Sequence, residues 1–389
     1  MSGPSIIRDR TAIVGIGTTE YVRDIGRSEL ETALEAIHGA LEDAGLEGGE
    51  VDAIFKIETP GEEPNSELEI ARNLGVQELR CWGGFGYGGG AACAPVVHSA
   101  MAIATGMASV AVAVRARNRG SGGRPWARTG ERVGGLAAFE APYGLASPVQ
   151  QIALVARRYM HEYGATPEDF AAVAVAQRAN ATHNPRAFFR DPITVEDVLS
   201  SRVIADPLHL LDCSLETDGA CAVVVTSIER ARDLKQQPVS ISGIAQGMPP
   251  RHYMMSGLLY QDDPFDLPAK HAARNVYCSA GIGPEEIDVA LLYDVFSPMV
   301  LWQLESYGFC KPGEAAAFVR EGHIAWPNGT LPVNTHGGSL SEAYVHGFNH
   351  ILEGVRQMRR TSTCQVEGAK TALVAGAAVV PSSALVLRN

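Results

Sequence analysis

A tyrosine and a histidine stand two residues apart in a glycine-rich stretch near the C-terminus. The segment GGSLSEAYVHGF occupies residues 337–348 and contains Tyr344 and His346. Tyrosine and histidine can both transfer protons, and glycine permits the tight turns that bring a backbone close to a ligand. The stretch predicts a glycine-rich turn that brings Tyr344 and His346 close together. For Tyr344 the alternative is a buried tyrosine whose hydroxyl bonds to a main-chain carbonyl. For His346 alone, the favoured interpretation is a structural histidine whose hydrogen bonds are satisfied within the protein.

The composition argues against several classes of protein. The chain has 389 residues and a formal net charge of −12, which argues against a general binder of nucleic acid or anionic membranes. No apolar stretch reaches the length of a membrane-spanning helix, and the first residues lack the apolar core of a signal peptide, so we expect a cytoplasmic protein. The seven cysteines are scattered without a C-x-x-C pair, which argues against a disulfide framework or a metal site built from this chain alone.

The chain repeats itself, which indicates two related halves of the α/β class. The segment AGLEGGEVDAIF at 44–55 matches AGIGPEEIDVAL at 280–291, and AIVGIG is echoed by SISGIA. Alternating apolar strands and amphipathic helices are typical of parallel sheets covered by helices. We expect an N-terminal half at 1–235, which includes an insert at about 115–210, and a C-terminal half at 236–389.

The predicted insert begins with an arginine-rich segment at 115–135. Its six arginines are Arg115, Arg117, Arg119, Arg124, Arg128 and Arg132. A solvated loop is the favoured interpretation, and a contact to phosphate or to a partner is the alternative, because guanidinium groups bind phosphate through two parallel hydrogen bonds. Two helices follow: one has a Ser147 start and a Gly164 stop, and the other has Thr166 as its N-cap.

These segments resemble the thiolase superfamily over essentially the whole chain, particularly its lipid-transfer-protein-like branch. The similarity is carried by the duplicated halves, the helical insert, TDGACAVVV at 217–225, YDVFSPMVLWQLESYGF at 293–309 and VNTHGGSLSEAYVHG at 333–347. The resemblance implies the thiolase fold, an α/β architecture in which two duplicated halves form a five-layered αβαβα body with a helical loop insert. Such chains usually form dimers.

The chain departs from thiolases at the positions that carry their chemistry. Tyr344 stands at the catalytic histidine position, and Tyr293 stands where the family usually has asparagine or histidine. Gly89, within the run GGFGYGGG, stands at the position of the nucleophilic cysteine, and the nearby Cys93 is expected to be a packing residue. The C-terminal stretch LVAGAAVVPSS lacks the second cysteine. A glycine cannot accept an acyl group, so thiolytic chemistry is not expected at Gly89.

The pattern resembles retro-aldolases of this branch, which cleave β-hydroxyacyl-CoA thioesters of steroid side chains. The resemblance implies an enzyme that releases a ketone and a short acyl-CoA such as propionyl-CoA, without a covalently bound cofactor or a metal of its own. It also implies a homodimer associated with a small OB-fold and zinc-ribbon protein. Zinc is expected only in that partner protein. The rival functions are a thiolase or acyltransferase that uses another cysteine, and a non-catalytic scaffold that binds acyl-CoA.

Retro-aldol cleavage requires a base, an acid and hydrogen-bond donors for the thioester oxygen. We expect Tyr293 to be the base and Tyr344 the proton donor, and the reverse assignment stays open. His336 and His346 are candidates for polarising the thioester or tuning the tyrosines. Asp294 could orient a tyrosine or cap a helix, and a core aromatic at a strand end is the alternative for Tyr293.

Three glycines complete the predicted site. The missing side chain at Gly89 is expected to leave room for a bulky substrate such as a fused ring system. The turns at Gly86–Gly90 and at Gly337 and Gly338 are expected to supply backbone N–H groups that stabilise the enolate.

Overall fold

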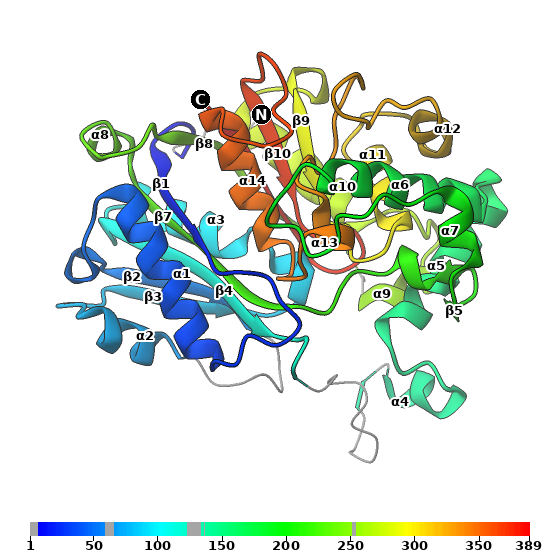
Figure 1. Ribbon diagram of the computed structural model, residues 1–389, viewed down its shortest axis with the longest axis horizontal. Helices are drawn as coiled ribbons and strands as arrows, with labels where there is room; N and C mark the ends of the chain where they lie inside the picture. Colours follow the sequence, from blue (N-terminus) through cyan, green and yellow to red (C-terminus); the bar gives the residue numbers. More distant parts are fainter. Residues whose placement is uncertain (1–6, 59–65, 123–133, 136, 251–253) are drawn as a thin grey trace.

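The computed structural model describes residues 7–58, 66–122, 134–135, 137–250 and 254–389. Within these residues, nine strands form one continuous sheet in the order β3-β2-β4-β7-β1-β8-β11-β10-β9 (Figure 1). The strands are β1 (Thr11–Thr18), β2 (Ala53–Ile57), β3 (Cys81–Phe85), β4 (Val110–Asn118), β7 (Asp218–Ser227), β8 (Val239–Gly247), β9 (Val289–Leu292), β10 (Thr371–Ala375) and β11 (Ser382–Arg388).

The sheet consists of two half-sheets that are joined at one narrow seam. The strands β1 and β8 pair at only two positions, Ala12 with Ser240 and Ile13 with Val239. On one side of the seam β2 is parallel to β3 and β4, and β7 runs antiparallel to β4 and β1. On the other side β9 is parallel to β10, and β11 runs antiparallel to β10 and β8. The same pairing pattern therefore occurs twice.

The helices repeat in the same order. Helix α1 (Glu29–Ala44) follows β1 as α10 (Pro268–Ala280) follows β8, and α3 (Ala94–Ala104) precedes β4 as α14 (Phe348–Arg359) precedes β10. The counterpart of β3 in the second half is a single parallel bridge between Ala290 and Val333. The repetition is in keeping with two related halves, while the boundaries at 235 and 236 stay a prediction.

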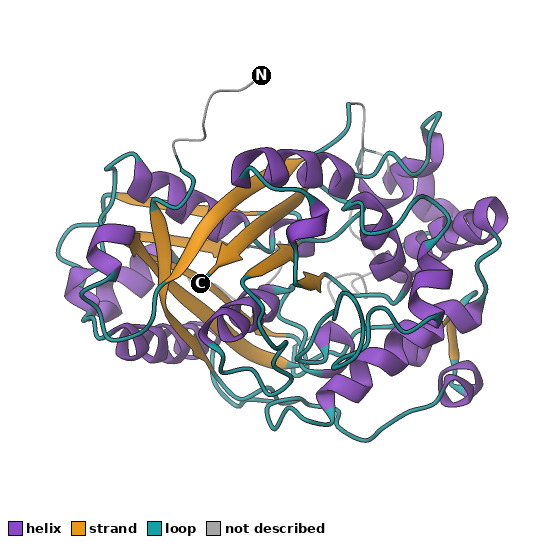
Figure 2. Ribbon diagram, turned by 90° about the horizontal axis from the view of Figure 1, so that it is seen from above, coloured by secondary structure: helices purple, strands orange, loops and turns teal. Residues whose placement is uncertain are grey.

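The layers follow from the alternation of side chains along the strands. On β4, Ala111 packs toward α3 and α14, whereas Val112 packs toward α1 and α2 (Glu67–Leu74). On β9, Leu291 faces α3 and α14, whereas Leu292 faces α10 and α11 (Pro298–Ser306). Helices α3 and α14 are therefore the central layer of a five-layered αβαβα body, and helices also cover the outer faces (Figure 2).

The insert helices pack outside the second half-sheet, at the right of Figure 1. Helix α5 (Pro148–Tyr163) begins after Ser147 and ends at Gly164, and α6 (Pro167–Ala181) begins after Thr166, as the capping patterns predict. The remaining helices are α4 (Ala137–Glu140), α7 (Val195–Ser200), α8 (Ile228–Ala231), α9 (Met254–Gly257), α12 (Ala315–Arg320) and α13 (Gly338–Ser341), and a small sheet pairs β5 (Val203–Ala205) with β6 (Leu208–His209). No helix among the described residues combines the length and the apolar character needed to cross a membrane.

The expected solvated loop at 115–135 is wrong for its first part. Strand β4 continues to Asn118, and the side chains of Arg115, Arg117 and Arg119 are at most 4% exposed. The spacing of two places Arg115 and Arg117 on the same face of the strand as Ala113, which points toward the central helices, and Arg119 follows the end of the strand. This period of two is the sequence signal that the loop interpretation overlooked. Arg124, Arg128 and Arg132 lie outside the described residues.

Replacement of Gly17 by alanine is expected to destabilise the fold. A Cβ atom at Gly17 would lie 2.0 Å from the carbonyl oxygen of Ala36 in α1, so strand and helix would have to separate. We expect Gly17→Ala to lower the free energy of unfolding by about 2 kcal/mol or more in urea denaturation. Gly39→Ala is the control, because its Cβ would meet only the Cα of Gly17 at 3.6 Å and alanine favours the helix. Equal stability of the two variants would contradict this packing.

Candidate active site

The candidate site lies where the end of β9 meets the turn that leads into α14. The side chain of Asn334 joins the two: its amide donates to the carbonyl oxygen of Leu292, and its oxygen accepts from the N–H of Leu292, both at 2.8 Å. Asn334 thereby pairs with β9 in the manner of one more strand residue. This pairing brings Tyr293, the next residue along, to the turn that contains Tyr344.

The two tyrosines predicted from the sequence meet at this point. The hydroxyl of Tyr293 donates a hydrogen bond of 3.4 Å to the hydroxyl of Tyr344. Tyr293 is 2% exposed, and its main-chain N–H and carbonyl both bond to the side chain of Gln303, whereas Tyr344 is half-buried. Burial raises the pKa of Tyr293 well above its ordinary value, and the adjacent Tyr344 adds to the effect. Tyr293 is therefore a neutral hydroxyl with a proton to donate.

The ring of Tyr293 packs directly against two glycines. A Cβ atom at Gly89 would lie 2.0 Å from Cζ and 2.2 Å from Oη of Tyr293, and one at Gly347 would lie 2.6 Å from its Cδ2. The end of the tyrosine ring therefore fills the space that the sequence analysis assigned to a bulky substrate. In this structure the missing side chain makes room for Tyr293, and a contact between Gly89 and substrate stays a prediction.

Arg117 and His346 lie beside Tyr344. The guanidinium carbon of Arg117 is 5.2 Å from the centre of the Tyr344 ring, and the rings of Tyr344 and His346 meet edge to face with their centres 5.2 Å apart. Arg117 also donates to the His346 imidazole. Burial lowers the pKa of His346 well below its ordinary value, and the charges of Arg117, Arg115 and Arg119 lower it further. His346 is therefore a neutral acceptor, and Arg117 is the cation beside Tyr344.

Asp294 caps a helix, which is one of the two roles that the sequence left open. Its carboxylate accepts the main-chain N–H groups of Ser339 and Leu340 at 2.7 and 3.1 Å, at the start of α13. Its Oδ1 also lies 3.0 Å from Nε2 of His350. The ring of His350 is centred 6.5 Å from that of Tyr293, so the cap adjoins the site through His350.

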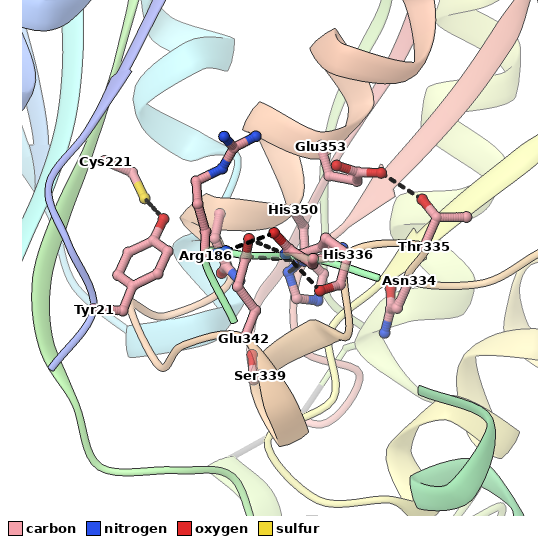
Figure 3. A network of polar contacts seen from close by, with 12 residues as sticks. Tyr21, Arg186, Cys221, Asn334, Thr335, His336, Ser339, Glu342, His350 and Glu353 are labelled. Atoms are coloured by element: carbon pink, nitrogen blue, oxygen red, sulfur yellow. Dashed lines mark hydrogen bonds and ion pairs between the residues drawn. The ribbon is translucent and has the colours of Figure 1, made fainter. Parts of the chain in front are cut away.

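His336 belongs to a buried polar network around Glu342 (Figure 3). Its Nε2 lies 3.3 Å from Nδ1 of His350 and 3.7 Å from Oε2 of Glu342. Burial and then the neighbouring His350 lower the pKa of His336 to about 3, so the imidazole is neutral. The contacts of His336 tie it to this network, and its predicted role in polarising a thioester is untested. His350, in the first turn of α14, was missed because a single histidine outside the quoted motif gives no chemical signal by itself.

The paired glycines of the turn let the backbone approach its neighbours closely. Gly337 has a φ of 104° and Gly338 a φ of 63°, which is the left-handed region that favours glycine. A Cβ atom at Gly337 would lie 2.6 Å from Cβ of Ala181, and one at Gly338 would lie 2.0 Å from Oδ2 of Asp294. The N–H of Gly337 is already bonded to the carbonyl of Asn334 at 2.8 Å. Substrate binding by these two glycines stays a prediction.

Cys93 has the surroundings of a packing residue, as expected. It is fully buried before α3, its thiol donates to the carbonyl of Val374 at 3.6 Å, and its N–H donates to the Ser383 hydroxyl at 3.0 Å. Burial raises the pKa of its thiol far above the ordinary value. Because the thiolate is the nucleophilic form, Cys93 is poorly suited to accept an acyl group. Among the described residues, no cluster of three His, Cys, Asp or Glu side chains could hold a metal ion.

Comparison with known proteins places these features in a family. Residues 253–387 match the family model described as "Thiolase C-terminal domain-like". The chain is 48% identical to the 17-hydroxy-3-oxo-4-pregnene-20-carboxyl-CoA lyase of Mycobacterium tuberculosis, over 98% of this chain and 100% of that protein. It is 46% identical to a steroid side-chain-cleaving aldolase of Thermomonospora curvata, over 98% of this chain and 99% of that protein.

Solved structures agree with this placement. The structure named "Ltp2-ChsH2(DUF35) aldolase" matches with a TM-score of 0.92 and 45% identity, over 99% of both chains. Human mitochondrial 3-ketoacyl-CoA thiolase, at 13% identity, matches with a TM-score of 0.72, which shows the fold alone. The chain belongs to the thiolase superfamily, together with the steroid-CoA lyase and the steroid side-chain-cleaving aldolase. The predicted thiolase fold and family are confirmed.

The buried neutral His336 predicts a loss of stability in acid. Its pKa is lowered from 6.5 to about 3 in the folded state, so the unfolded state binds the proton more readily. The stability that depends on neutral His336 is complete above pH 6.5 and is lost as the pH falls through the interval from 6.5 toward 3.

We expect His336→Gln to lose about 1 kcal/mol less unfolding free energy than the unmodified protein when the pH falls from 6 to 5. Urea denaturation at both pH values measures this difference. His38→Gln, at an exposed position of α1, is the control and should keep the pH dependence of the unmodified protein. The same pH dependence in both variants would contradict the burial of a neutral His336.

Proposed function

We propose that this protein is a retro-aldolase that cleaves a β-hydroxyacyl-CoA thioester, with a steroid side chain as the acyl group. The products are a ketone and a short acyl-CoA such as propionyl-CoA. The observation that carries the proposal is the pair of hydrogen-bonded tyrosine hydroxyls at the place where Gly89 leaves no nucleophile. Similarity over the whole chain to a steroid-CoA lyase and to a steroid side-chain-cleaving aldolase supports the substrate class.

The reaction needs one proton removed and one proton supplied. A base takes the proton of the β-hydroxyl, the oxygen becomes the carbonyl of the ketone, and the bond between Cα and Cβ breaks. Its electron pair passes to Cα and is delocalised onto the thioester oxygen as an enolate. An acid then protonates Cα, which gives the short acyl-CoA. No covalent acyl-enzyme forms, so the reaction does not require the cysteine of a thiolase.

We assign the base to Tyr344 and the acid to Tyr293, which is the reverse of the order first expected from the sequence. Tyr293 is buried and neutral, which suits a proton donor. Tyr344 has the Arg117 cation beside its ring and accepts the hydrogen bond of Tyr293, so its oxygen is the acceptor of the pair. After cleavage, the proton held by Tyr344 passes to Tyr293 along their hydrogen bond, so each turnover restores both groups.

The thioester oxygen requires donors as the enolate develops. The turn Gly86–Gly90 adjoins the tyrosines, because a Cβ atom at Gly88 would lie 3.6 Å from Nε2 of His346 and one at Gly89 would meet Tyr293. Its main-chain N–H groups are our candidates for this role, as expected from the sequence. Backbone donors fixed in position stabilise an oxyanion without reorganisation during the reaction.

We also propose that the protein works as a homodimer in complex with a small OB-fold and zinc-ribbon protein. A solved relative with a TM-score of 0.92 is named as an aldolase that includes a DUF35 component, which supports a heteromeric assembly. Zinc would belong to that component alone, and CoA thioester would enter as substrate. A cytoplasmic location is part of the same proposal.

The tyrosine pair is tested by Tyr344→Phe and Tyr293→Phe. The purified protein with its DUF35-type component is given a steroid β-hydroxyacyl-CoA, and release of ketone and short acyl-CoA is followed by chromatography. We expect each variant to lower kcat at least about 100-fold, because each removes a proton-transferring group. Tyr87→Phe, at a 61% exposed tyrosine of the neighbouring turn, is the control.

The outcomes of this experiment separate the rival functions. Unchanged cleavage by Tyr344→Phe would leave the reaction class in place and overturn the assignment of the base. Absence of cleavage by the unmodified complex, together with tight binding of the CoA thioester, would favour the non-catalytic scaffold.

A matched pair of glycine substitutions tests the packing beneath Tyr293. In Gly89→Ala the new methyl group would lie 2.0 Å from Cζ of Tyr293 and would displace the ring from Tyr344. We expect activity to fall at least about tenfold while the protein stays folded. In Gly86→Ala the new methyl group meets nothing within 4 Å, so activity should be retained. Comparable activities of the two variants would show that the position of the Tyr293 ring is unimportant.

A further inference from the structure

A polar cavity of about 380 Å³ lies against the C-terminal part of α14. Its walls come from the ends of β1 and α1, from α14 and from the segment that follows α6. Its charged and amide-bearing lining residues are Asp43, Arg186, Gln236, Arg356 and Arg359. Neither Tyr293 nor Tyr344 lines this cavity, so it is separate from the site of the proposed reaction.

Arg356 contributes a buried cation whose N–H groups are not hydrogen-bonded. Its side chain is 7% exposed, and its nearest carboxylate oxygens, on Glu353 and Glu342, lie 3.8 and 3.9 Å away. Among the contacts of the described residues, the Arg356 guanidinium makes ion pairs at these distances but no hydrogen bond. The unused N–H groups belong to a side chain that lines the cavity.

The two carboxylates near Arg356 are held by other partners. Glu342 accepts from the side-chain amides of Asn184 at 2.9 Å and Asn349 at 2.8 Å. Glu353 accepts from the hydroxyls of Thr335 and Ser362, both at 2.6 Å. Burial lowers the pKa of Arg356, but the two carboxylates raise it above its ordinary value, so the guanidinium stays protonated. Their hydrogen bonds keep them from approaching the guanidinium more closely.

Arg186 brings a second cation to the same cavity. Its side chain has no hydrogen bond or ion pair among the described contacts, and it lies near enough to Arg356 for the like charge to act on it. Burial and then the charge of Arg356 lower the pKa of Arg186. Figure 3 shows Arg186 beside the network around Glu342. The carboxylates of Glu342 and Glu353 oppose this lowering of the pKa, and Arg186 adds a second set of guanidinium donors to the cavity.

The third arginine is already neutralised within the chain. Arg359 donates to Asp43 at 2.7 Å and to the main-chain oxygens of Val14 and Gln237 at 2.8 and 3.1 Å. Asp43 is therefore matched by Arg359, and its charge does not compensate the other two arginines. Among the residues that line the cavity, Arg186 and Arg356 are the cations that Asp43 does not match, and the carboxylates of Glu342 and Glu353 lie 3.9 and 3.8 Å from Arg356.

We propose that this cavity binds a phosphate group, through Arg186 and Arg356. Guanidinium groups hold phosphate through parallel charge-assisted hydrogen bonds, and a phosphate dianion in the cavity would accept from the N–H groups of Arg356 and Arg186. The volume of about 380 Å³ lies in the range of small-molecule sites and accommodates a small phosphomonoester as well as the free ion. The site goes beyond the proposed cleavage and does not depend on it.

Calorimetric titration with inorganic phosphate and with glycerol 3-phosphate, at constant ionic strength, tests the proposal on the intact protein. We expect saturable binding that Arg186→Gln weakens at least about tenfold, the loss of one charge-assisted contact. The control is Arg190→Gln, at an exposed arginine of the same segment that does not line the cavity. Arg186 is itself exposed in part, so its replacement should leave the fold intact.

Each result decides the question. Tighter binding of glycerol 3-phosphate than of phosphate identifies a phosphomonoester as the ligand, and the opposite order identifies the free ion. No saturable binding of either probe, or the same loss of affinity in Arg186→Gln and Arg190→Gln, would overturn the proposal. Because steroid-CoA cleavage is not the readout, these outcomes are independent of the proposed function.

Discussion

The close packing of Tyr293 on Gly89 is the constraint on which the rest of the site depends. A side chain of any size at position 89 would occupy the space of the tyrosine hydroxyl, so a nucleophile at this position and Tyr293 in this rotamer exclude each other. Gly347 meets the same edge of the ring at Cδ2 and Cε2, and Asn334 fixes the backbone just before it. With the ring in this place, its hydroxyl lies 3.4 Å from that of Tyr344. The loss of a nucleophile at position 89 and the packing of the Tyr293 ring therefore depend on each other.

The duplicated architecture explains how both halves of the chain contribute to one small site. Gly89 precedes α3 and Gly347 precedes α14, and these two helices form the central layer between the half-sheets. The end of β9 supplies Tyr293, while the end of β4 supplies Arg117 from the other half-sheet. The fold thus gathers Tyr293, Tyr344 and Arg117 at one point: Tyr293 and Arg117 lie at strand ends, and Tyr344 lies in the turn before α14. Sites placed on such rigid elements keep their geometry during turnover.

Much of this arrangement could be predicted from the sequence, because the internal repeats and the glycine-rich turns indicate the two halves and the segments that carry the site. The repeats indicated the alternating halves, and the departures at Tyr344, Tyr293 and Gly89 indicated a non-thiolytic site. Arg117 was missed because the high glycine and arginine content indicates a loop. The alternation with a period of two, which extends β4 to Asn118, indicates a strand. The polar network was beyond prediction, since the capping by Asp294 depends on where α13 begins in space. The direction of proton transfer likewise depends on burial and on a charge from the other half-sheet.

The central claim is that the tyrosine pair cleaves the carbon–carbon bond without a covalent acyl-enzyme. The most direct test is the intact mass of the protein, measured by rapid quench during turnover of a steroid β-hydroxyacyl-CoA by the complete complex. The account predicts that ketone and short acyl-CoA accumulate while the mass of the chain stays that of the unmodified protein. A population of chains that carries an acyl group on a cysteine, formed and lost at the rate of turnover, would contradict it.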